Sequence, residues 1–280
     1  MPSTFPMKNL WFLLSAKFFF SCCLLINFQM ISSGQSLKGQ FVSQQTTQSE
    51  IPKSLERKFR RDASRLALRL EAEKEDLQYL GIGIPQSTIE IFYELLTQIY
   101  IQEESAKSIA KCKVHTFPDP SIDQIVIIYE KDIEWAAPLR DGISETESPE
   151  INDLLDEYEL IIEKHVPWND TDDALTIRPK EPLNMAALAN EFTDIEGIIE
   201  IDLGIPKVGG NDISLNRFQN GWEVQYILKF GSISSGKGKN HIWKYHALDD
   251  GTIKFIEESG SPIPKWMRCS LEEKLMVLKL

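Results

Sequence analysis

Apolar residues recur every three or four positions over residues 52–80 and again over residues 87–100, the spacing of amphipathic helices. The apolar stripes are Leu55, Phe59, Leu66, Leu70 and Leu77 in the first segment, and Ile89, Phe92, Leu96, Ile99 and Tyr100 in the second. The outer face of the first helix is basic, from Arg57 to Arg69. This face either contacts an acidic partner or is solvated and docked on the protein's own acidic segment; we favour the second interpretation.

The middle of the chain contains segments with the alternation of a strand and segments with the three-to-four-residue spacing of a helix. Cys112–Phe117 and Gln124–Tyr129 are predicted to be strands joined by a proline turn. Residues 130–173 then carry fifteen acids and three bases. Within them we predict a helix that starts near Pro149 and has inward positions from Ile151 to Ile162. The acidic cluster Asp170, Asp172 and Asp173 is expected to be solvated.

A helix predicted over Pro182–Phe192 has small residues on one face and precedes a region in which apolar and polar positions alternate. This period of two predicts five strands: Gly197–Asp202, Ile213–Phe218, Trp222–Phe230, His241–Leu248 and Thr252–Glu257. Asn-Gly and Asp-Gly pairs favour tight hairpins between them. The predicted fold is therefore α+β, with an antiparallel C-terminal meander of about five strands, flanking helices and a helix-rich N-terminal half. A helix followed by a meander is also similar to cystatin-like or NTF2-like folds, a likeness that assigns no function.

The N-terminus has the order of a secretory signal peptide. Lys8 precedes an apolar run from Phe18 to Phe28, and small residues follow up to Gly34. Cleavage after Gly34 would leave Gln35 first. Two alternatives stay open: an uncleaved anchor, disfavoured by Lys17 and Asn27, and a lipoprotein modified at Cys22.

The chain divides into a signal peptide (1–34), a polar flexible leader (35–50), an N-terminal α+β region (51–170), a helix plus antiparallel meander (171–264) and a helical tail (265–280). The regions 51–170 and 171–264 can share one sheet, because the first offers few strands. The expected location is outside the cell or in its envelope (periplasm or outer surface), with no membrane span left after cleavage.

The net charge limits the classes of partner that the sequence allows, and the cysteine content indicates which disulfide can form. The net charge of the whole chain is −12. Such an excess of acid disfavours nucleic-acid backbones and anionic membrane surfaces as partners. Cys112 and Cys269 are the cysteines outside the signal segment. In an exported protein they can form a disulfide, although two buried thiols fit the sequence as well.

No motif in the sequence carries a catalytic signature. Gly231–Lys237 has the spacing of a phosphate loop, but Gly238 stands where Ser or Thr is needed and strands flank the segment. The histidines His241 and His246 are five residues apart and point to opposite faces of a strand. We therefore expect no catalytic residue, no metal site and no cofactor.

Four aromatic residues are the candidate binding residues: Trp222 and Tyr226 on one predicted strand, and Trp243 and Tyr245 on another. Each pair shares a strand face. Such stripes are usually core, and an exposed row would instead bind a sugar or an extended peptide.

The C-terminal third, about residues 184–264, resembles a family of uncharacterised secreted bacterial proteins. The resemblance rests on residues 188–192, Gly221-Trp222, Trp243-Lys244-Tyr245, Asp250-Gly251, Glu258-Ser259-Gly260 and Pro262-Ile263-Pro264. Similar sequences carry two cysteines in the loop before Trp243, where this chain has Ile233 and Lys237. The resemblance implies secretion and no assigned activity.

These observations favour an exported, non-catalytic protein that binds a peptide, protein or glycan. A secreted hydrolase that uses acidic residues in the concavity of the sheet is one alternative, and an envelope structural protein is another. A pocket with converging carboxylates would favour the enzyme, whereas an aromatic face or an open edge strand would favour binding.

Overall fold

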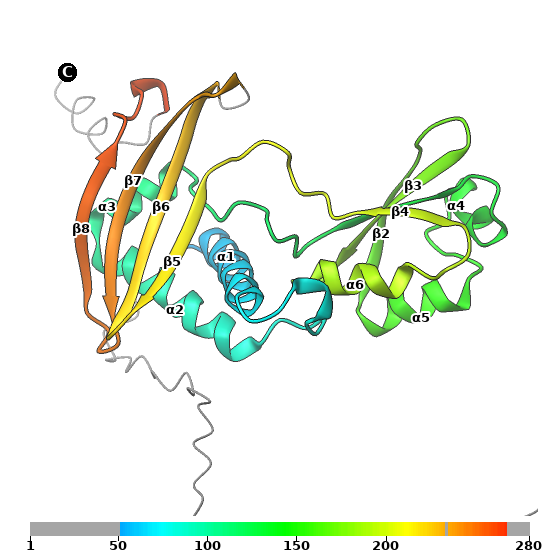
Figure 1. Cartoon of the computed structure of the whole chain (residues 1–280), viewed down its shortest axis with the longest axis horizontal. Helices are drawn as coiled ribbons and strands as arrows, with labels where there is room; N and C mark the ends of the chain where they lie inside the picture. The colour runs from blue at the N-terminus through cyan, green and yellow to red at the C-terminus, as the bar shows by residue number, and fades with distance from the viewer. Residues whose placement is uncertain (1–50, 233–234, 268–280) are drawn as a thin grey trace, which may run out of the picture. The chain divides into compact units, whose positions relative to one another are not determined.

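The computed structural model describes residues 51–232 and 235–267 (Figure 1). The predicted signal peptide and leader, and residues 268–280 of the predicted helical tail, lie outside the described residues, so the expectations for them stay predictions. Within the described ranges, no helix combines the length and the apolar character needed to cross a membrane.

The fold is α+β. Its helices, including single 3₁₀ turns, are α1 (Lys53–Ala72), η1 (Leu77–Tyr79), α2 (Gln86–Gln102), α3 (Glu104–Lys111), η2 (Glu134–Ala136), α4 (Ala137–Arg140), α5 (Pro149–Glu157), α6 (Met185–Phe192) and η4 (Lys265–Met267). Its strands are β1 (Ile125–Glu130), β2 (Leu160–Pro167), β3 (Asp172–Pro179), β4 (Ile198–Asp202), β5 (Asp212–Phe218), β6 (Gly221–Ser232), β7 (Lys237–Leu248) and β8 (Ile253–Gly260).

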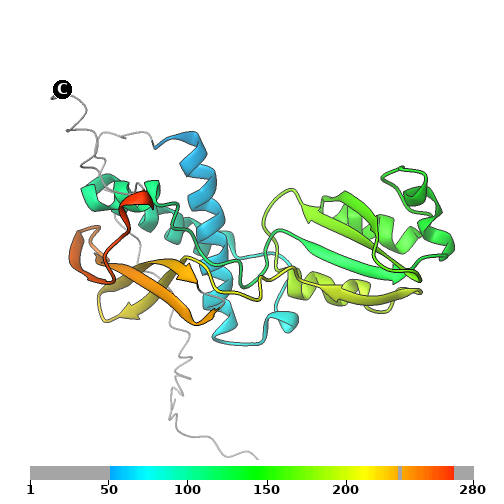
Figure 2. The ribbon, with the colours of Figure 1, turned by 90° about the horizontal axis from the view of Figure 1, so that it is seen from above.

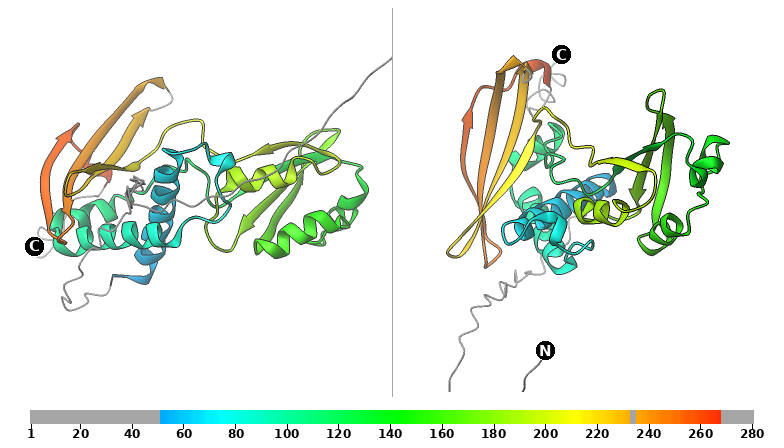
Figure 3. Two further views of the ribbon diagram at one scale, coloured as in Figure 1. Left: turned by 60° about the horizontal axis from the view of Figure 1, so that its bottom comes forward. Right: turned by 45° about the vertical axis from the view of Figure 1, so that its right-hand side comes forward.

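The strands β5-β6-β7-β8 form a four-stranded antiparallel meander. Figures 2 and 3 show α1, α2 and α3 on one face of this sheet. The strict alternation of β6 and β7 turns one set of side chains toward these helices. Phe92 of α2, for example, meets Trp222 of β6 edge to face, with ring centroids 5.1 Å apart.

The strands β2-β3-β1-β4 form the other antiparallel sheet. One of its two inner strands, β1, is apolar throughout its first five residues, as suits a strand with neighbours on both sides. The helices α5 and α6 cover one face of this sheet (Figure 3). Met185, Leu188 and Phe192 of α6 are fully buried against Ile127 of β1 and its neighbours.

The meander is one strand shorter than predicted. Gly197–Asp202 does form strand β4, but it pairs with β1 in the other sheet. Residues 203–211 separate it from β5, too long a connection for a tight hairpin. Because β3 and β4 both pair with β1, this sheet spans the expected region boundary at residue 170.

The acidic stretch was the least well predicted. The helix from Pro149 ends at Glu157, and the chain turns at Glu159 with φ +48°. Ile161 and Ile162, expected on the helix, lie in β2, where β-branched residues fit better. Asp173, expected to be solvated, is 2% exposed on β3.

Residues 112–117 do not form the predicted strand. They follow α3 as an irregular segment whose polar groups bond to α1 in place of a neighbouring strand. Asp62 accepts hydrogen bonds from the backbone N–H and the hydroxyl of Thr116. Arg69 donates to the carbonyls of Phe117 and Asp119. The basic face of α1 is thus partly docked on the protein's own chain.

Candidate functional site

The strand β4 lies at an edge of its sheet. It pairs only with β1 among the described residues. The register skips Ile199, which has no partner residue on β1 and is 54% exposed. An edge strand presents backbone N–H and C=O groups that no neighbour occupies, and a bulge locally re-aims a side chain. The outer edge of β4 is therefore open to pairing.

The helix α6 supplies the second wall of the site. Asn184 caps its first turn, where the side chain accepts a hydrogen bond from the Ala187 N–H at 3.4 Å. The core side of the helix carries the buried residues described above. A separate stripe at helical spacing faces the strand: Ala186, Ala189, Asn190 and Thr193. Small side chains on this stripe leave room beside β4.

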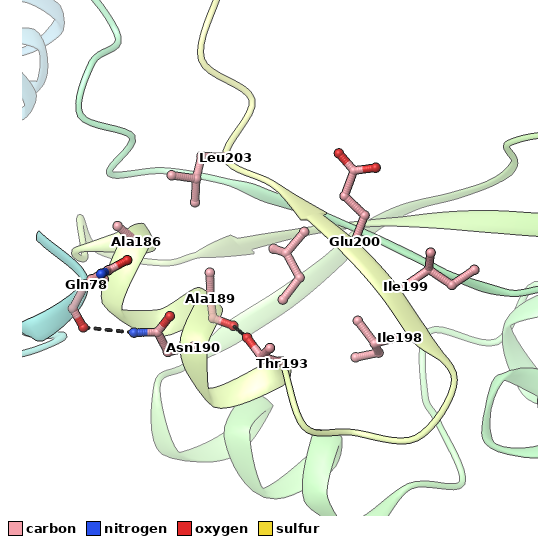
Figure 4. Close-up of a pocket in the computed structure, with 10 residues that line it drawn as sticks. Gln78, Ala186, Ala189, Asn190, Thr193, Ile198, Ile199, Glu200 and Leu203 are labelled. Atoms are coloured by element: carbon pink, nitrogen blue, oxygen red, sulfur yellow. Dashed lines mark hydrogen bonds between the residues drawn. The ribbon is translucent and has the colours of Figure 1, made fainter.

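A groove of about 320 Å³ lies between these two walls. Residues 198–201 and Leu203 line its strand side, and the stripe of α6 lines the other (Figure 4). Its volume is at the lower end of ligand-binding pockets, which span about 300–1,000 Å³. Because β4 has five residues, its edge is roughly 17 Å long at about 3.4 Å per residue. An extended segment of four or five residues matches that length.

One end of the groove is fixed by the turn η1. Gln78 lines the groove, and its carbonyl accepts a hydrogen bond from the Asn190 amide at 2.8 Å. The buried amide of Asn184 donates to the carbonyls of Leu77 and Gly81 at 2.7 and 3.3 Å. These bonds attach the turn to α6, so the wall and the end of the groove form one unit.

The segment that builds both walls carries only negative formal charge. Residues 181–206 contain six acids and no lysine, arginine or histidine. The acids are Glu181, Glu191, Asp194, Glu196, Glu200 and Asp202. None of them forms a salt bridge with a described residue. The carboxylate of Asp202 accepts a hydrogen bond from the Gly204 N–H at 2.8 Å.

A second hollow, of about 310 Å³, is lined by the loop after α4 and by the bulged part of β2. His165 reaches it, and the Nε2 atom of His165 lies 3.1 Å from a carboxylate oxygen of the buried Asp173. Burial raises the pKa of Tyr129, and the charge of Asp173 adds to the rise. His165 makes no hydrogen bond to a hydroxyl or thiol in the described part of the chain, so no nucleophile is paired with it.

The four aromatic candidates are brought together, but inside the protein. Trp222, Tyr226 and Trp243 are 3–5% exposed and Tyr245 is 0% exposed. Tyr226 and Tyr245 meet edge to face with centroids 5.8 Å apart. They form the core between the meander and its helices, as such stripes usually do. These four residues therefore do not form an exposed aromatic row on the sheet.

The remaining sequence candidates are placed as follows. Cys112 is buried and disulfide-bonded, whereas Cys269 lies outside the described residues, so the pairing of these two stays a prediction. The phosphate-loop spacing falls on the hairpin between β6 and β7, where Gly231 pairs with Gly238. Within the described ranges, no three His, Cys, Asp or Glu side chains are grouped as a metal site would need.

Sequence reasoning missed the groove. The small residues of the helix were visible, and two of them, Ala186 and Ala189, line it. The depletion of basic residues over 181–206 was a further signal. What the sequence could not show was that β4 leaves the meander and becomes an edge.

Comparison of this chain with protein-family models, with curated proteins and with solved structures found no match.

Proposed function

We propose that the protein is an exported, non-catalytic binding protein whose ligand is an extended peptide segment. The observation that supports this is the open outer edge of β4 beside the groove of α6. A peptide can add to such an edge as one more strand. Backbone hydrogen bonds then supply affinity, and the groove receives alternate side chains. Export rests on residues 1–34 and belongs to the same proposal.

A peptide suits this site better than a glycan does. Sugar sites commonly offer an aromatic face, and none of the described residues that line the groove is aromatic. A groove of this length beside a strand edge is instead matched by a chain that repeats every two residues. A larger protein partner would present the same element as an exposed strand or tail.

The test measures binding of short fluorescent peptides to the purified protein by polarisation. The probe alternates valine with lysine, because valine favours an extended chain. Two further probes carry N-methyl groups, one on the valine amides and one on the lysine amides. In a strand, alternate amides face the same side, so only one of these probes should lose its bonds to β4. Each lost hydrogen bond costs about 0.5–1.5 kcal/mol, so two lower affinity roughly 5- to 150-fold.

A groove-filling variant tests the second wall. Ala189→Trp places a large side chain in the groove and should abolish binding, whereas Ala72→Trp, at the exposed C-terminal end of α1, should not. Both substitutions replace the best helix former, so they carry a similar small cost in stability. If both N-methylated probes bind as well as the parent, or if Ala189→Trp binds normally, the edge-strand function is wrong.

The hydrolase alternative has less support. Glu223, on the outer face of the meander, accepts a hydrogen bond from the Gln225 amide at 2.8 Å and lies 3.7 Å from Lys244. The Gln225 bond is the main cause that lowers the pKa of Glu223, and Lys244 adds to it. A general acid at neutral pH needs a raised pKa, so this carboxylate is not tuned to donate a proton.

A further inference from the structure

We infer that the peptide taken up at β4 is basic, with lysine or arginine alternating with aliphatic residues; this inference rests on the proposed function. The stretch 181–206 has no basic residue, although the whole chain has 30 lysines and arginines in 280 residues, about one in nine. The local depletion falls on both walls of the groove.

The acids of the strand lie where a neighbouring strand would meet them. Glu200 lines the groove and is exposed, and Asp202 is exposed two residues further along β4. Residues two apart on a strand share a face, so both carboxylates can face alternate residues of an added strand. Opposite charges directly across two strands attract, and like charges repel.

The helix contributes charge of the same sign. Its C-terminal end lies at Thr193, which lines the groove, and the last carbonyls of a helix carry partial negative charge. Glu191 and Asp194 flank this end and are exposed. Elsewhere most basic residues of α1 are paired: Arg60, Arg61 and Arg69, for example, each have a carboxylate partner. No lysine, arginine or histidine among the described residues forms a salt bridge with the acids around the groove.

The bound peptide must carry apolar residues between its cationic residues. The floor beside the strand is formed by Ile198, Ile201 and Leu203, all partly buried against the core. A side chain that points into the groove meets these residues and the two alanines of α6. Small aliphatic side chains such as valine fit there, whereas a charged side chain would lose its hydration.

The experiment compares two matched probes with the purified protein: a fluorescent peptide of Lys-Val repeats and one of Glu-Val repeats. At low salt the lysine probe should bind about tenfold more tightly. At 1 M salt the preference should nearly vanish, because the screening length falls from about 10 Å at 0.1 M to about 3 Å. Glu200→Lys should weaken the lysine probe and strengthen the glutamate probe. Glu145→Lys, in the exposed loop after α4, makes the same charge change outside the groove and should alter neither.

The outcomes separate this inference from the function on which it rests. Equal affinity for both probes, with binding still blocked by N-methylation, would leave the edge-strand site standing and overturn the basic preference. Absence of binding by either probe at every salt concentration would overturn both. A preference that is unchanged in Glu200→Lys would place the source of charge selection elsewhere and overturn the inference.

Discussion

The carboxylate of Asp62 offers the sharpest test of how this fold is held together. It lies on α1, is 2% exposed, and accepts hydrogen bonds from the backbone and hydroxyl of Thr116 at 2.8 Å each. Nδ1 of His115 lies 2.7 Å from its other oxygen. Arg65, 3% exposed, donates to the same Thr116 hydroxyl at 2.9 Å. Asp62→Ala removes the acceptor at the centre of this cluster.

The expected loss of stability follows from the groups that lose a partner when the Asp62 carboxylate is removed. The Thr116 N–H loses its acceptor in a buried place, which costs about 1–3 kcal/mol. Arg65 loses one opposing charge and keeps its ion pair with Asp123, whose carboxylate oxygen lies 3.7 Å away. Burial, with a smaller contribution from Arg61, already lowers the pKa of Arg65 to about 10, and Asp62 acts against this. Removing one partner of a buried charge cluster costs about 3–5 kcal/mol, a large share of a total stability of about 5–15 kcal/mol.

Urea unfolding followed by tryptophan fluorescence measures the loss. The matched control is Asp249→Ala, which breaks a bidentate pair with Arg217 at 2.8 and 2.9 Å. That pair is largely solvated, with side chains 41% and 35% exposed, so the control should lose less than about 1 kcal/mol. Equal losses in the two variants would refute the reasoning that burial sets the value of the cluster.

Two further variants test the core of the meander. Trp243→Ala should lower the free energy of unfolding by about 3–5 kcal/mol, because it is a large-to-small change at a site that is 3% exposed. The control Trp266→Ala, at a site that is 72% exposed, should lower it little. Similar unfolding midpoints for the two variants would contradict the assignment of Trp243 to the core. Burial raises the pKa of Tyr245 to about 12 from 10.0, so between pH 10 and 12 the unfolded chain ionises this phenol first and stability falls. Tyr245→Phe should remove about 2–3 kcal/mol of that alkaline loss and cost about 1 kcal/mol at neutral pH through the 2.7 Å bond to Ser105; an unchanged alkaline slope in unfolding experiments would contradict this.

The meander was predictable because its information is local. Strands β6 and β7 alternate apolar and polar positions, and Asn220-Gly221 and Asp250-Gly251 fix the turns that join β5 to β6 and β7 to β8. The apolar–polar alternation of a strand and the residue preferences of a turn are both set within about a dozen residues, so a single sequence reveals them. The same holds for α2, whose apolar stripe was predicted at nearly its observed length. The helical pattern predicted over residues 52–80 is too long for α1, which ends at Ala72 and leaves Leu77 in the separate turn η1.

The other sheet was not predictable in this way. Its strand order depends on β1 lying between β3 and β4, contacts that join segments more than forty residues apart. Asp173 illustrates the difficulty: among neighbouring acids it reads as a solvated residue, yet pairing of β3 with β1 buries it. The many acids of this region indicated a solvated surface, and they made its strands hard to recognise from the sequence.

The distribution of aromatic residues explains what kind of binding the groove can provide. Trp222, Tyr226, Trp243 and Tyr245 build the core of the meander. The described residues that line the groove between α6 and β4 are aliphatic, small or polar, and none of them is aromatic. Aromatic anchors supply much of the energy in tight interfaces. A site without them depends on backbone hydrogen bonds and on charge, so it should tolerate many sequences, bind weakly and lose affinity with salt. Such behaviour suits a protein that recognises extended, basic segments as a class.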